Sequence, residues 1–574
     1  MSKNKKIAIW LPILLAASIA LGIYIGNQYL FLNTGGQRNL TGNRNKINTV
    51  LNIINEQYVD SVDMPKLIES TIPKIFGELD PHSVYISADD ASLVNEELEG
   101  SFSGIGVTFN LQTDTILVVS VISGGPAEKA GLLPFDRIIT INDSVFSGNN
   151  SDQNAIMRTL RGEKNSTVKL GVLRSTSPEL LYFDVTRGDV PVNSVDVSYM
   201  ADNEIGYIKI SKFGRTTYTE FLFAIAKLKE LGAASFIIDL RGNTGGYMDA
   251  AINLINEFMP AGNLIVYTEG KAFPRSDIYS NGSGICKENP IVVLTDETSA
   301  SASEIFAGAI QDNDRGLIIG RRTYGKGLVQ NPIRLSDGSE IRLTIGRYYV
   351  PSGRSIQKEY ELGKAEEYDL DIYNRYLHGE FDTADSIKLD ESLMFKTVGG
   401  RTVYGGGGIM PDIFIPRDTS GVTSYYTNVV NSLVLNLYAL EYSDKNHEKL
   451  SSFSTWEELY AYLQTQDILN SFTDFAAQKG IRKRPALINI SGGLIKNQLE
   501  AYIVRNFFGD DGFYPIFQHD DVTLLRAVKV LKEGKALPTA ELIKMSTQNL
   551  QSLSNGQNSR YGLIRELIIE DYLI

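Results

Sequence analysis

The spacing of apolar residues divides the chain into blocks of different periodicity. Over residues 46–98, apolar positions recur at helical spacing in INTVLNIINEQYV and MPKLIESTIPKIFGEL, so a helical N-terminal segment is predicted there. From about Gly100 the pattern changes to short alternating runs such as GIGVTFN, TILVVSVI and TVKLGVLR. Two helical stretches, PAEKAG and DQNAIMRTLRG, interrupt these runs. Residues 99–188 are therefore predicted to form a small β-rich domain.

A third and a fourth block follow. Residues 189–419 alternate buried-strand runs, such as IGYIKI, SFIIDL and PIVVLTD, with helical stretches such as YTEFLFAIAKLKELG. This alternation predicts an α/β core with a mainly parallel sheet. Residues 420–574 are largely helical and polar, with TWEELYAYL and VTLLRAVKVL as examples. The fold class predicted for the whole chain is multidomain α/β.

The N-terminus is predicted to be a membrane anchor. Residues 1–6 contain three lysines, and residues 7–32 form an apolar run long enough to cross a bilayer, which needs about 20 residues. No good cleavage site follows directly, so an uncleaved single-pass signal anchor is favoured over a signal peptide or a buried helix. Residues 33–45 are polar and are predicted to be a linker.

Basic residues flank this apolar run on both sides, so they give little information on its orientation. The short tail favours a cytoplasmic N-terminus, an inner-membrane location and the bulk of the chain in the periplasm or otherwise outside the cytoplasm.

Charge and composition exclude several classes of function. The net charge of -13 argues against nucleic acid as a partner, because phosphate binding needs a basic face. A single cysteine, Cys286, and four scattered histidines give no ligand spacing for a metal site. We therefore expect no metal and no cofactor.

The stretch GRRTYGKG, Gly320 to Gly327, has the spacing of a phosphate-binding loop. Such a loop needs a hydroxyl after the lysine and then a helix. Gly327 follows Lys326, however, and LVQNPIRL is predicted to be extended. An ATPase is therefore disfavoured. A lysine between two glycines can instead be buried and lose its charge, which makes it a general base near neutral pH. A surface lysine in a glycine-rich turn is the alternative.

Two further segments carry candidate chemistry. TSASASEIF places Ser299, Ser301 and Ser303 where a strand meets a helix that is predicted to begin near Ala302. A hydroxyl at a helix N-terminus lies where backbone N–H groups stabilise an oxyanion, although the same S-x-x-E pattern is also an ordinary capping box. DLRGNTGG contains a Gly-Gly pair, typical of close backbone approach or of a tight turn.

In combination, these motifs resemble the C-terminal processing peptidases, also called tail-specific serine proteases. DLRGNTGG, TSASASEIF and TYGKGLVQ follow one another behind a block, GPAEKAGLLPFDRIITINDSV, that resembles a PDZ domain. The resemblance also covers LDPHSVYIS and RYYVPSGRSIQ, and it spans roughly residues 45–415. It implies a ClpP/crotonase-like α/β protease core.

The resemblance also implies roles for individual residues. The nucleophile falls on Ser301, the general base on Lys326 and the amide that orients the lysine on Gln330. In an extended segment Lys326 and Gln330 share one face, which fits this role. The oxyanion hole falls on the backbone N–H groups of Gly245 and Ala302.

The glycine loop of the PDZ-like block comprises Gly104, Ile105, Gly106 and Val107, and it is implied to hold the carboxylate of a substrate's C-terminal tail. A small β-rich module without a ligand is the alternative for this block.

The resulting functional prediction is a membrane-anchored serine endopeptidase that cleaves proteins near their C-termini. Its partners would be peptide substrates bound by their tails and, through the N-terminal helix, the membrane. The sequence does not decide whether the protein forms a homo-oligomer. The alternative is a PDZ adaptor that binds tails without cutting them. The segments Leu362 to Phe395 and Arg401 to Asp412, and the chain beyond residue 420, match no assigned motif.

Overall fold

The computed structural model describes residues 38–112, 115–122, 124–146, 153–174, 177 and 179–537, together with Ser18 and Leu21. The chain divides into two compact units, Met1–Glu78 and Leu79–Ile574. The predicted anchor over residues 7–32 lies outside the described residues, apart from those two isolated positions. Among the helices that are described, none combines the length and the apolar character needed to cross a bilayer.

The first unit contains two described helices, α2 (Arg38–Gln57) and α3 (Met64–Gly77). The carboxylate of Asp63 caps α3 by accepting a hydrogen bond from the Lys66 N–H at 3.1 Å. The predicted linker over 33–45 overlaps α2 from Arg38 onwards, and residues 33–37 lie outside the described part.

Residues 46–98 are mostly helical, as predicted, but a strand interrupts the helices at Val84–Ile86. After α3 the chain forms a short strand, β1 (Val84–Ile86), and then helix α4 (Ala88–Glu99). Strand β1 pairs antiparallel with β18 (Glu340–Tyr349) of the second unit. The LDPHS segment therefore leads into the second sheet of the α/β core rather than into a separate helical domain.

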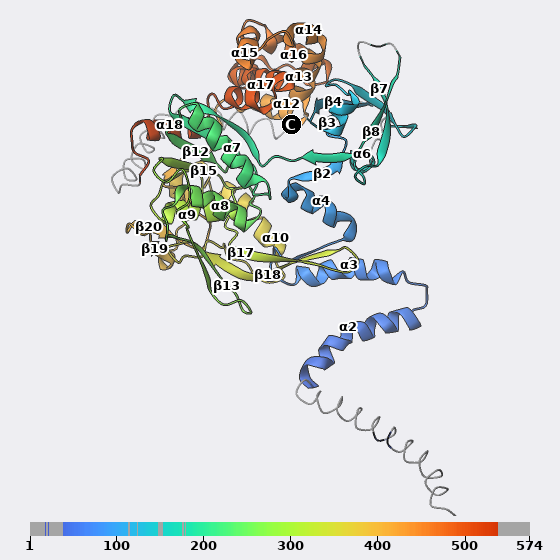
Figure 1. Cartoon of the computed structure of the whole chain (residues 1–574), viewed down its shortest axis with the longest axis vertical. Helices are drawn as coiled ribbons and strands as arrows, with labels where there is room; N and C mark the ends of the chain where they lie inside the picture. Colours follow the sequence, from blue (N-terminus) through green and yellow to red (C-terminus); the bar gives the residue numbers. More distant parts are fainter. Residues whose placement is uncertain are drawn as a thin grey trace, which may run out of the picture. The chain divides into compact units, whose positions relative to one another are not determined.

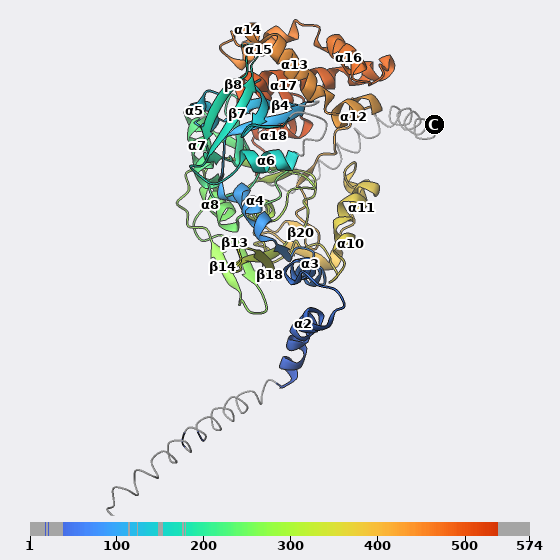
Figure 2. The same cartoon turned by 90° about the vertical axis from the view of Figure 1, so that its right-hand side faces the viewer.

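The predicted β-rich domain is present. Its sheet has the order β3-β4-β5-β7-β8, and β2 (Ser101–Gly104) pairs separately with β9 (Gly188–Pro191). The elements of the sheet and its helices are β3 (Val107–Gln112), β4 (Thr115–Val121), α5 (Pro126–Ala130), β5 (Arg137–Ile141), β6 (Ser144–Val145), α6 (Gln153–Leu160), β7 (Thr167–Leu173) and β8 (Leu181–Thr186). Figure 2 shows β4, β7 and β8 above α6. One apolar cluster, which includes Ile105, Ile156 and Val168, fills the space between sheet and helices.

The predicted α/β core contains a six-stranded sheet of order β10-β11-β12-β15-β16-β21, in which only the β10–β11 pair is antiparallel. Its strands are β10 (Val195–Asp202), β11 (Ile205–Ile210), β12 (Ser235–Asp239), β15 (Ile291–Thr295), β16 (Leu317–Gly320) and β21 (Ile413–Phe414). Alternate residues of each strand point to opposite faces, so Val293 and Val292 belong to two different apolar clusters.

Helices cover one face of this sheet, and a second sheet adjoins it. The helices are α7 (Thr217–Glu230), α8 (Met248–Phe258) and α9 (Ala302–Asp312), drawn in green in Figure 1. The second sheet comprises β1, β18, β13 (Leu264–Glu269), β14 (Ser276–Tyr279) and β17 (Leu328–Arg334). Its longest pair, β17 with β18, continues directly from the lysine of the GKG motif.

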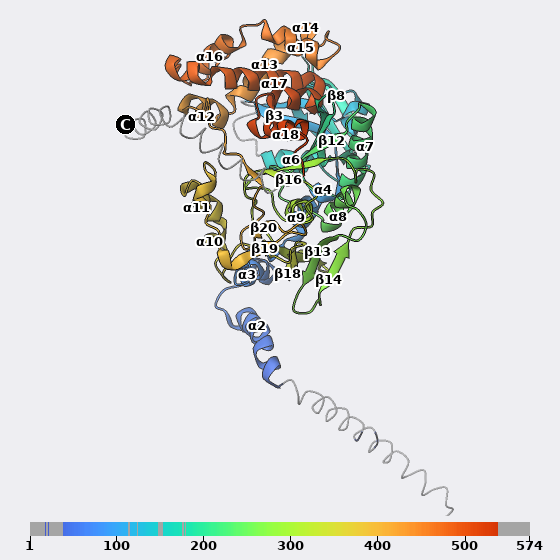
Figure 3. The ribbon, with the colours of Figure 1, turned by 90° about the vertical axis from the view of Figure 1, so that its left-hand side faces the viewer.

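The C-terminal region is helical, as predicted, but its last described helix belongs to the core. Helices α13 (Val434–Lys445), α16 (Ile468–Gln478) and α17 (Pro485–Phe517) lie together in Figure 3 and share an apolar cluster. Helix α18 (Val522–Lys532) instead places Leu524, Ala527 and Val530 against the second face of the central sheet. A boundary at residue 420 therefore separates α18 from the sheet that it covers. Residues 538–574 lie outside the described part.

Candidate active site

Ser301 lies in a sharp turn between β15 and α9. Its φ and ψ are 55° and -114°, a backbone conformation that costs a non-glycine residue about 1–3 kcal/mol. A strained strand-to-helix turn of this kind exposes the serine side chain at the end of a sheet in α/β hydrolases. An ordinary helix cap would have extended backbone at this position. The strain therefore indicates more than capping.

The structure also distinguishes Ser301 from its two neighbours. The Ser299 hydroxyl donates to the Leu240 carbonyl at 2.8 Å, and the Ser303 hydroxyl donates to the Asn243 carbonyl at 2.9 Å. Both of these serines are fully buried, whereas Ser301 is only half-buried. The outer two serines thus bind the DLRGNTGG turn to the serine turn, and the middle one is the candidate nucleophile.

Gly245 lies directly against Ser301. A Cβ atom on Gly245 would be 2.7 Å from the Ser301 Cβ and 3.0 Å from the Ala302 nitrogen, so any side chain there would clash. Its φ of 106° also favours glycine. The structure therefore places both predicted oxyanion residues, Gly245 and Ala302, beside Ser301. The Gly245 N–H itself donates to Asn243 Oδ1 at 2.9 Å.

Lys326 is held by the predicted glutamine. Its ammonium donates to Gln330 Oε1 at 3.0 Å, as the sequence predicts for an orienting amide. Lys326 itself precedes β17, and a register irregularity occurs between Val329 and Gln330, so the contact does not come from one regular strand. The segment after the lysine is extended, as predicted, and lacks the helix of a phosphate-binding loop.

Burial lowers the pKa of Lys326, and the charge of Arg342 lowers it further. The carboxylates of Glu304 and Asp80 act in the opposite direction but do not offset the burial. A lowered pKa increases the neutral fraction of the lysine at a given pH, and only the neutral amine can accept a proton.

The LDPHS turn supports Gln330. The glutamine Nε2 donates to the carbonyl oxygen of His82. Asp80 fixes this turn, since its carboxylate accepts from the backbone N–H groups of His82 and Ser83 and from the Thr344 hydroxyl. The sequence placed this segment within the family resemblance but indicated no role for it.

Glu304 joins the serine turn to the lysine loop, which we define as Arg322–Gly327. Its side chain is fully buried and accepts four hydrogen bonds. Oε2 accepts from the N–H groups of Ser301 at 2.9 Å and Lys326 at 2.8 Å, and Oε1 accepts from the Gly325 N–H and the Thr323 hydroxyl. The capping bond to Ser301 that the sequence predicts therefore exists and is one of four. The sequence signal for these additional bonds was the charged residue Glu304 at the start of the otherwise apolar helix sequence EIFAGAI.

Tyr348 makes a second connection. Its buried hydroxyl lies 3.1 Å from the Ser301 carbonyl and is also in contact with the Lys326 carbonyl. Ser301 and Lys326, 25 positions apart in sequence, thus share both a carboxylate and a phenol as common partners. In the described hydrogen bonds, the Ser301 hydroxyl is not paired with the Lys326 ammonium.

Replacing Glu304 with glutamine is expected to lower the free energy of unfolding by about 2–5 kcal/mol, because an NH₂ group replaces one acceptor and leaves two buried donors unpaired. Any catalytic activity that depends on Ser301 and Lys326 is expected to fall more than about ten-fold, because the two turns lose their common anchor. Chemical denaturation and initial rates measure both effects. Glu297→Gln, which changes a carboxylate paired with Arg321 at 2.6 Å, is the control.

The same variant has a pH signature. Burial raises the pKa of Glu304 from 4.5 to about 7, so between these values the folded state binds more protons than the unfolded state. Wild-type stability from this group is therefore full below pH 4.5 and is lost as the pH rises through 7. Glu304→Gln removes that dependence, and an unchanged pH profile of stability would contradict the assignment.

The predicted carboxylate loop of the β-rich domain connects β2 to β3. Ile105 is buried, Gly106 has a φ of 79°, and the carbonyls of both residues accept backbone hydrogen bonds from Ala127 and Ile122. In the described part of the sheet, β3 pairs only with β4 and forms the edge. An edge strand beside a glycine loop can accept a peptide as an added strand.

Comparisons with known proteins agree with this arrangement. Residues 204–365 match peptidase family S41, residues 103–193 match the PDZ domain, and residues 425–509 match a family of unknown function. The carboxy-terminal processing protease CtpA of Bacillus subtilis (strain 168) is 35% identical over 371 residues, which are 62% of this chain and 76% of CtpA. CtpB of the same organism is 33% identical over 317 residues, which are 55% of this chain and 65% of CtpB.

A solved structure, a photosystem II D1 C-terminal processing protease, is 28% identical and has a TM-score of 0.31. The match covers 54% of this chain and 88% of that chain. The sequence matches define a PDZ-containing serine hydrolase of peptidase family S41. Within that family, the chain belongs to the carboxy-terminal processing proteases.

Proposed function

We propose that this protein is an endopeptidase that cleaves protein substrates near their C-termini, with Ser301 as nucleophile and Lys326 as general base. The observation that carries the proposal is the pairing of a strained serine turn with a lysine of lowered pKa through the single buried carboxylate of Glu304. A binding module without catalytic activity has no need of this arrangement.

The reaction is acyl transfer. Neutral Lys326 takes the proton of the Ser301 hydroxyl, and the oxygen attacks the scissile carbonyl carbon. The ammonium of Lys326 then gives this proton to the leaving amine as the C–N bond breaks, which leaves an ester on Ser301. Water, deprotonated by Lys326, cleaves the ester and regenerates the serine. Gln330 keeps the lysine amine in place throughout, through the hydrogen bond to its Oε1.

The tetrahedral intermediate needs donors for its oxyanion. The N–H groups of Gly245 and Ala302 are the candidates, because both flank Ser301. The bond from Gly245 to Asn243 Oδ1 would be exchanged for one to the oxyanion during the reaction. A negative oxygen is a stronger acceptor than a neutral amide oxygen, which favours this exchange.

Substrate selection is assigned to the PDZ domain, where the loop from Gly104 to Val107 would receive the terminal carboxylate and β3 would pair with the tail. The apolar run over residues 7–32 is proposed to anchor the chain in the inner membrane, with the catalytic domains outside the cytoplasm. Alkaline extraction of membranes tests the anchor, and release of the chain into the soluble fraction would contradict it.

The decisive assay incubates the protein with a substrate protein that ends in apolar residues and follows its mass. Truncated products are expected with or without ATP and in the presence of a chelator. Amidation of the substrate's terminal carboxylate is expected to raise KM at least about ten-fold, because the charged group that the loop receives is lost. Dependence on ATP, loss of cleavage with chelator, or tail binding with no cleavage would each overturn the proposal.

A further inference from the structure

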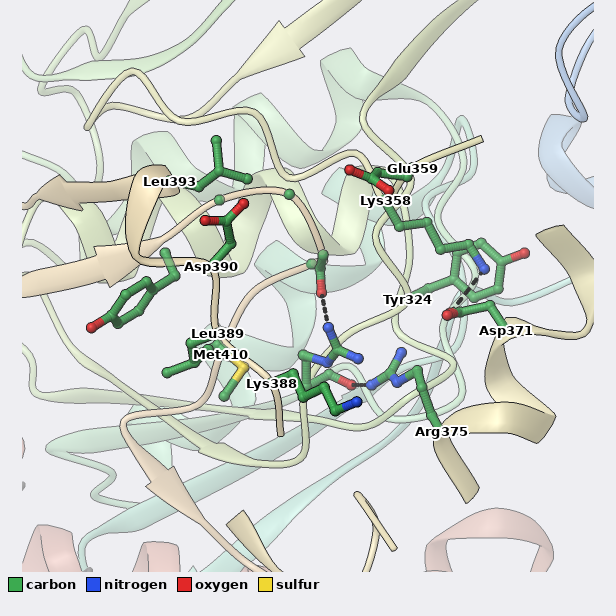
Figure 4. A pocket seen from close by; sticks show the side chains of 16 residues that line it. Tyr324, Lys358, Glu359, Asp371, Arg375, Lys388, Leu389, Asp390, Leu393 and Met410 are labelled. Atoms are coloured by element: carbon green, nitrogen blue, oxygen red, sulfur yellow. Dashed lines mark hydrogen bonds and ion pairs between the residues drawn. The ribbon is translucent and has the colours of Figure 1, made fainter. Parts of the chain in front are cut away.

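The segment Leu362 to Phe395, which lies almost entirely beyond the residues that match peptidase family S41, forms part of the wall around the lysine loop. It contains helices α10 (Ala365–Asp369) and α11 (Asp371–Leu377). Two of its side chains, Tyr368 and Arg375, are each only 4% exposed. Between this segment and the glycine run Gly405–Gly408 lies a cavity of about 290 Å³, shown in Figure 4. This inserted segment thus packs inward rather than extending from the surface.

Arg375 and Lys358 bind carbonyl groups of the lysine loop. The Arg375 guanidinium donates to the carbonyls of Thr323 at 3.0 Å and Arg322 at 2.9 Å. The backbone N–H of Lys358 donates to the Gly325 carbonyl at 2.9 Å, and its ammonium donates to the Tyr368 carbonyl at 3.0 Å. Figure 4 shows the Lys358 side chain beside Tyr324 and Asp371. The loop is therefore fixed between the core and the inserted segment.

The Tyr368 hydroxyl lies at the centre of a second set of contacts. It is 2.9 Å from His82 Nε2, and it accepts from Gln357 Nε2 at 3.2 Å. Burial is the main cause that lowers the pKa of His82 to about 4, so the imidazole is neutral near pH 7. Because the Gln357 NH₂ can only donate, the tyrosine O–H is free to donate to His82 Nε2. Donation in this direction requires the proton of neutral His82 to be on Nδ1.

Both partners of Tyr368 lead to the catalytic lysine. His82 presents its backbone carbonyl to Gln330 Nε2, and Gln330 Oε1 accepts from the Lys326 ammonium at 3.0 Å. Gln357 Oε1 accepts from the N–H of Gly327, the residue after the lysine, at 2.8 Å. One hydroxyl thus supports the lysine side chain through His82 and the lysine backbone through Gln357.

We propose that Tyr368 is a positioning residue for the general base: its hydroxyl holds the His82 turn, and through Gln330 the Lys326 amine, in the geometry required for proton transfer. This inference rests on the proposed serine–lysine function. It assigns a role to a segment that lies outside the sequence motifs. The role requires no contact between Tyr368 and the substrate.

The test compares Tyr368→Phe with Tyr373→Phe, a matched change on α11 at a side chain that is 56% exposed. Tyr368→Phe is expected to lower kcat about 5- to 30-fold with KM within two-fold, because a loosened base slows proton transfer without altering tail binding. His82→Leu, which keeps the carbonyl but removes the partner of the hydroxyl, is expected to show the same loss. Tyr373→Phe is expected to match the wild type.

A double-mutant cycle separates positioning from general stability. In a Gln330→Ala background the route through His82 is already broken and only the route through Gln357 to the lysine backbone is left, so Tyr368→Phe is expected to cause a smaller fractional loss of kcat than in the wild-type background. An equal fractional loss in both backgrounds, or a wild-type kcat for Tyr368→Phe, would overturn the inference. A Ser301→Ala arm identifies the other failure: cleavage that persists there would overturn the proposed function, and this inference with it.

Discussion

Replacing Ser301 with alanine is expected to reduce kcat/KM for a tail-bearing protein substrate by at least about 10⁴-fold, because loss of a catalytic nucleophile removes the covalent route altogether. Mass spectrometry of the products over time measures the loss. The variant is expected to fold, since the Ser301 N–H and carbonyl, not its hydroxyl, carry the contacts to Glu304 and Tyr348. Its temperature of unfolding is expected to be unchanged or slightly higher.

Ser303→Ala is the matched control. The Ser303 hydroxyl donates to the Asn243 carbonyl, so its loss is expected to cost about 1–3 kcal/mol of stability for a buried acceptor left unpaired. Cleavage is expected to persist within about ten-fold of the wild type. Full activity in Ser301→Ala, or a loss of activity in Ser303→Ala alone, would show that Ser301 is not the nucleophile of the SASAS motif.

Replacing Lys326 with methionine is expected to lower kcat by at least about 10³-fold, because methionine fills the space of the lysine stem but cannot accept a proton. KM is expected to change little, since the PDZ domain is untouched. Active-site labelling with a fluorophosphonate, which reports the reactivity of Ser301 without a protein substrate, is expected to slow in parallel. Labelling at the wild-type rate would contradict the role of Lys326 as the base.

Wild-type activity is expected to rise with pH along a limb set by Lys326. The base works only when neutral, and its neutral fraction increases as the pH rises through its pKa. Because burial lowers this pKa, the midpoint of the limb is expected below 10.5, the ordinary lysine value.

The stability of the fold is expected to depend on the same group. The folded state binds fewer protons than the unfolded state between the two pKa values of Lys326, so stability from this group is full above pH 10.5 and is lost as the pH falls through the folded pKa. Lys326→Met removes this loss.

Several features of the site were accessible from local sequence because they depend on neighbouring residues. The strand–turn–helix around Ser301 follows from the change in periodicity between PIVVLT and ASEIFAGAI, and the structure begins α9 at Ala302. The extended run after Lys326 follows from Pro332 and the β-branched residues around it, and it excludes a phosphate-binding loop. Lys326 and Gln330 are only four positions apart in the sequence, so local spacing could indicate the contact between them.

Other features depend on contacts between distant segments, which spacing cannot reveal. The strand β1 was missed because its three residues are defined by pairing with β18, some 255 positions later. Helix α18 was assigned to a separate domain because its amphipathic pattern predicts that one face is buried but does not identify the element that packs against this face. It covers the central sheet of the core.

The sequence by itself determined the order of the domains, the class of chemistry and the candidate residues Ser301, Lys326 and Gln330, because each of these is carried by a short motif. Only the tertiary structure decided how they act together. Glu304, Tyr348, His82 and Tyr368 come from four separate segments, and it is folding that brings their polar groups around one serine and one lysine. Buried polar groups must find partners, so the carboxylate of Glu304 acquires four donors and fixes both turns at once.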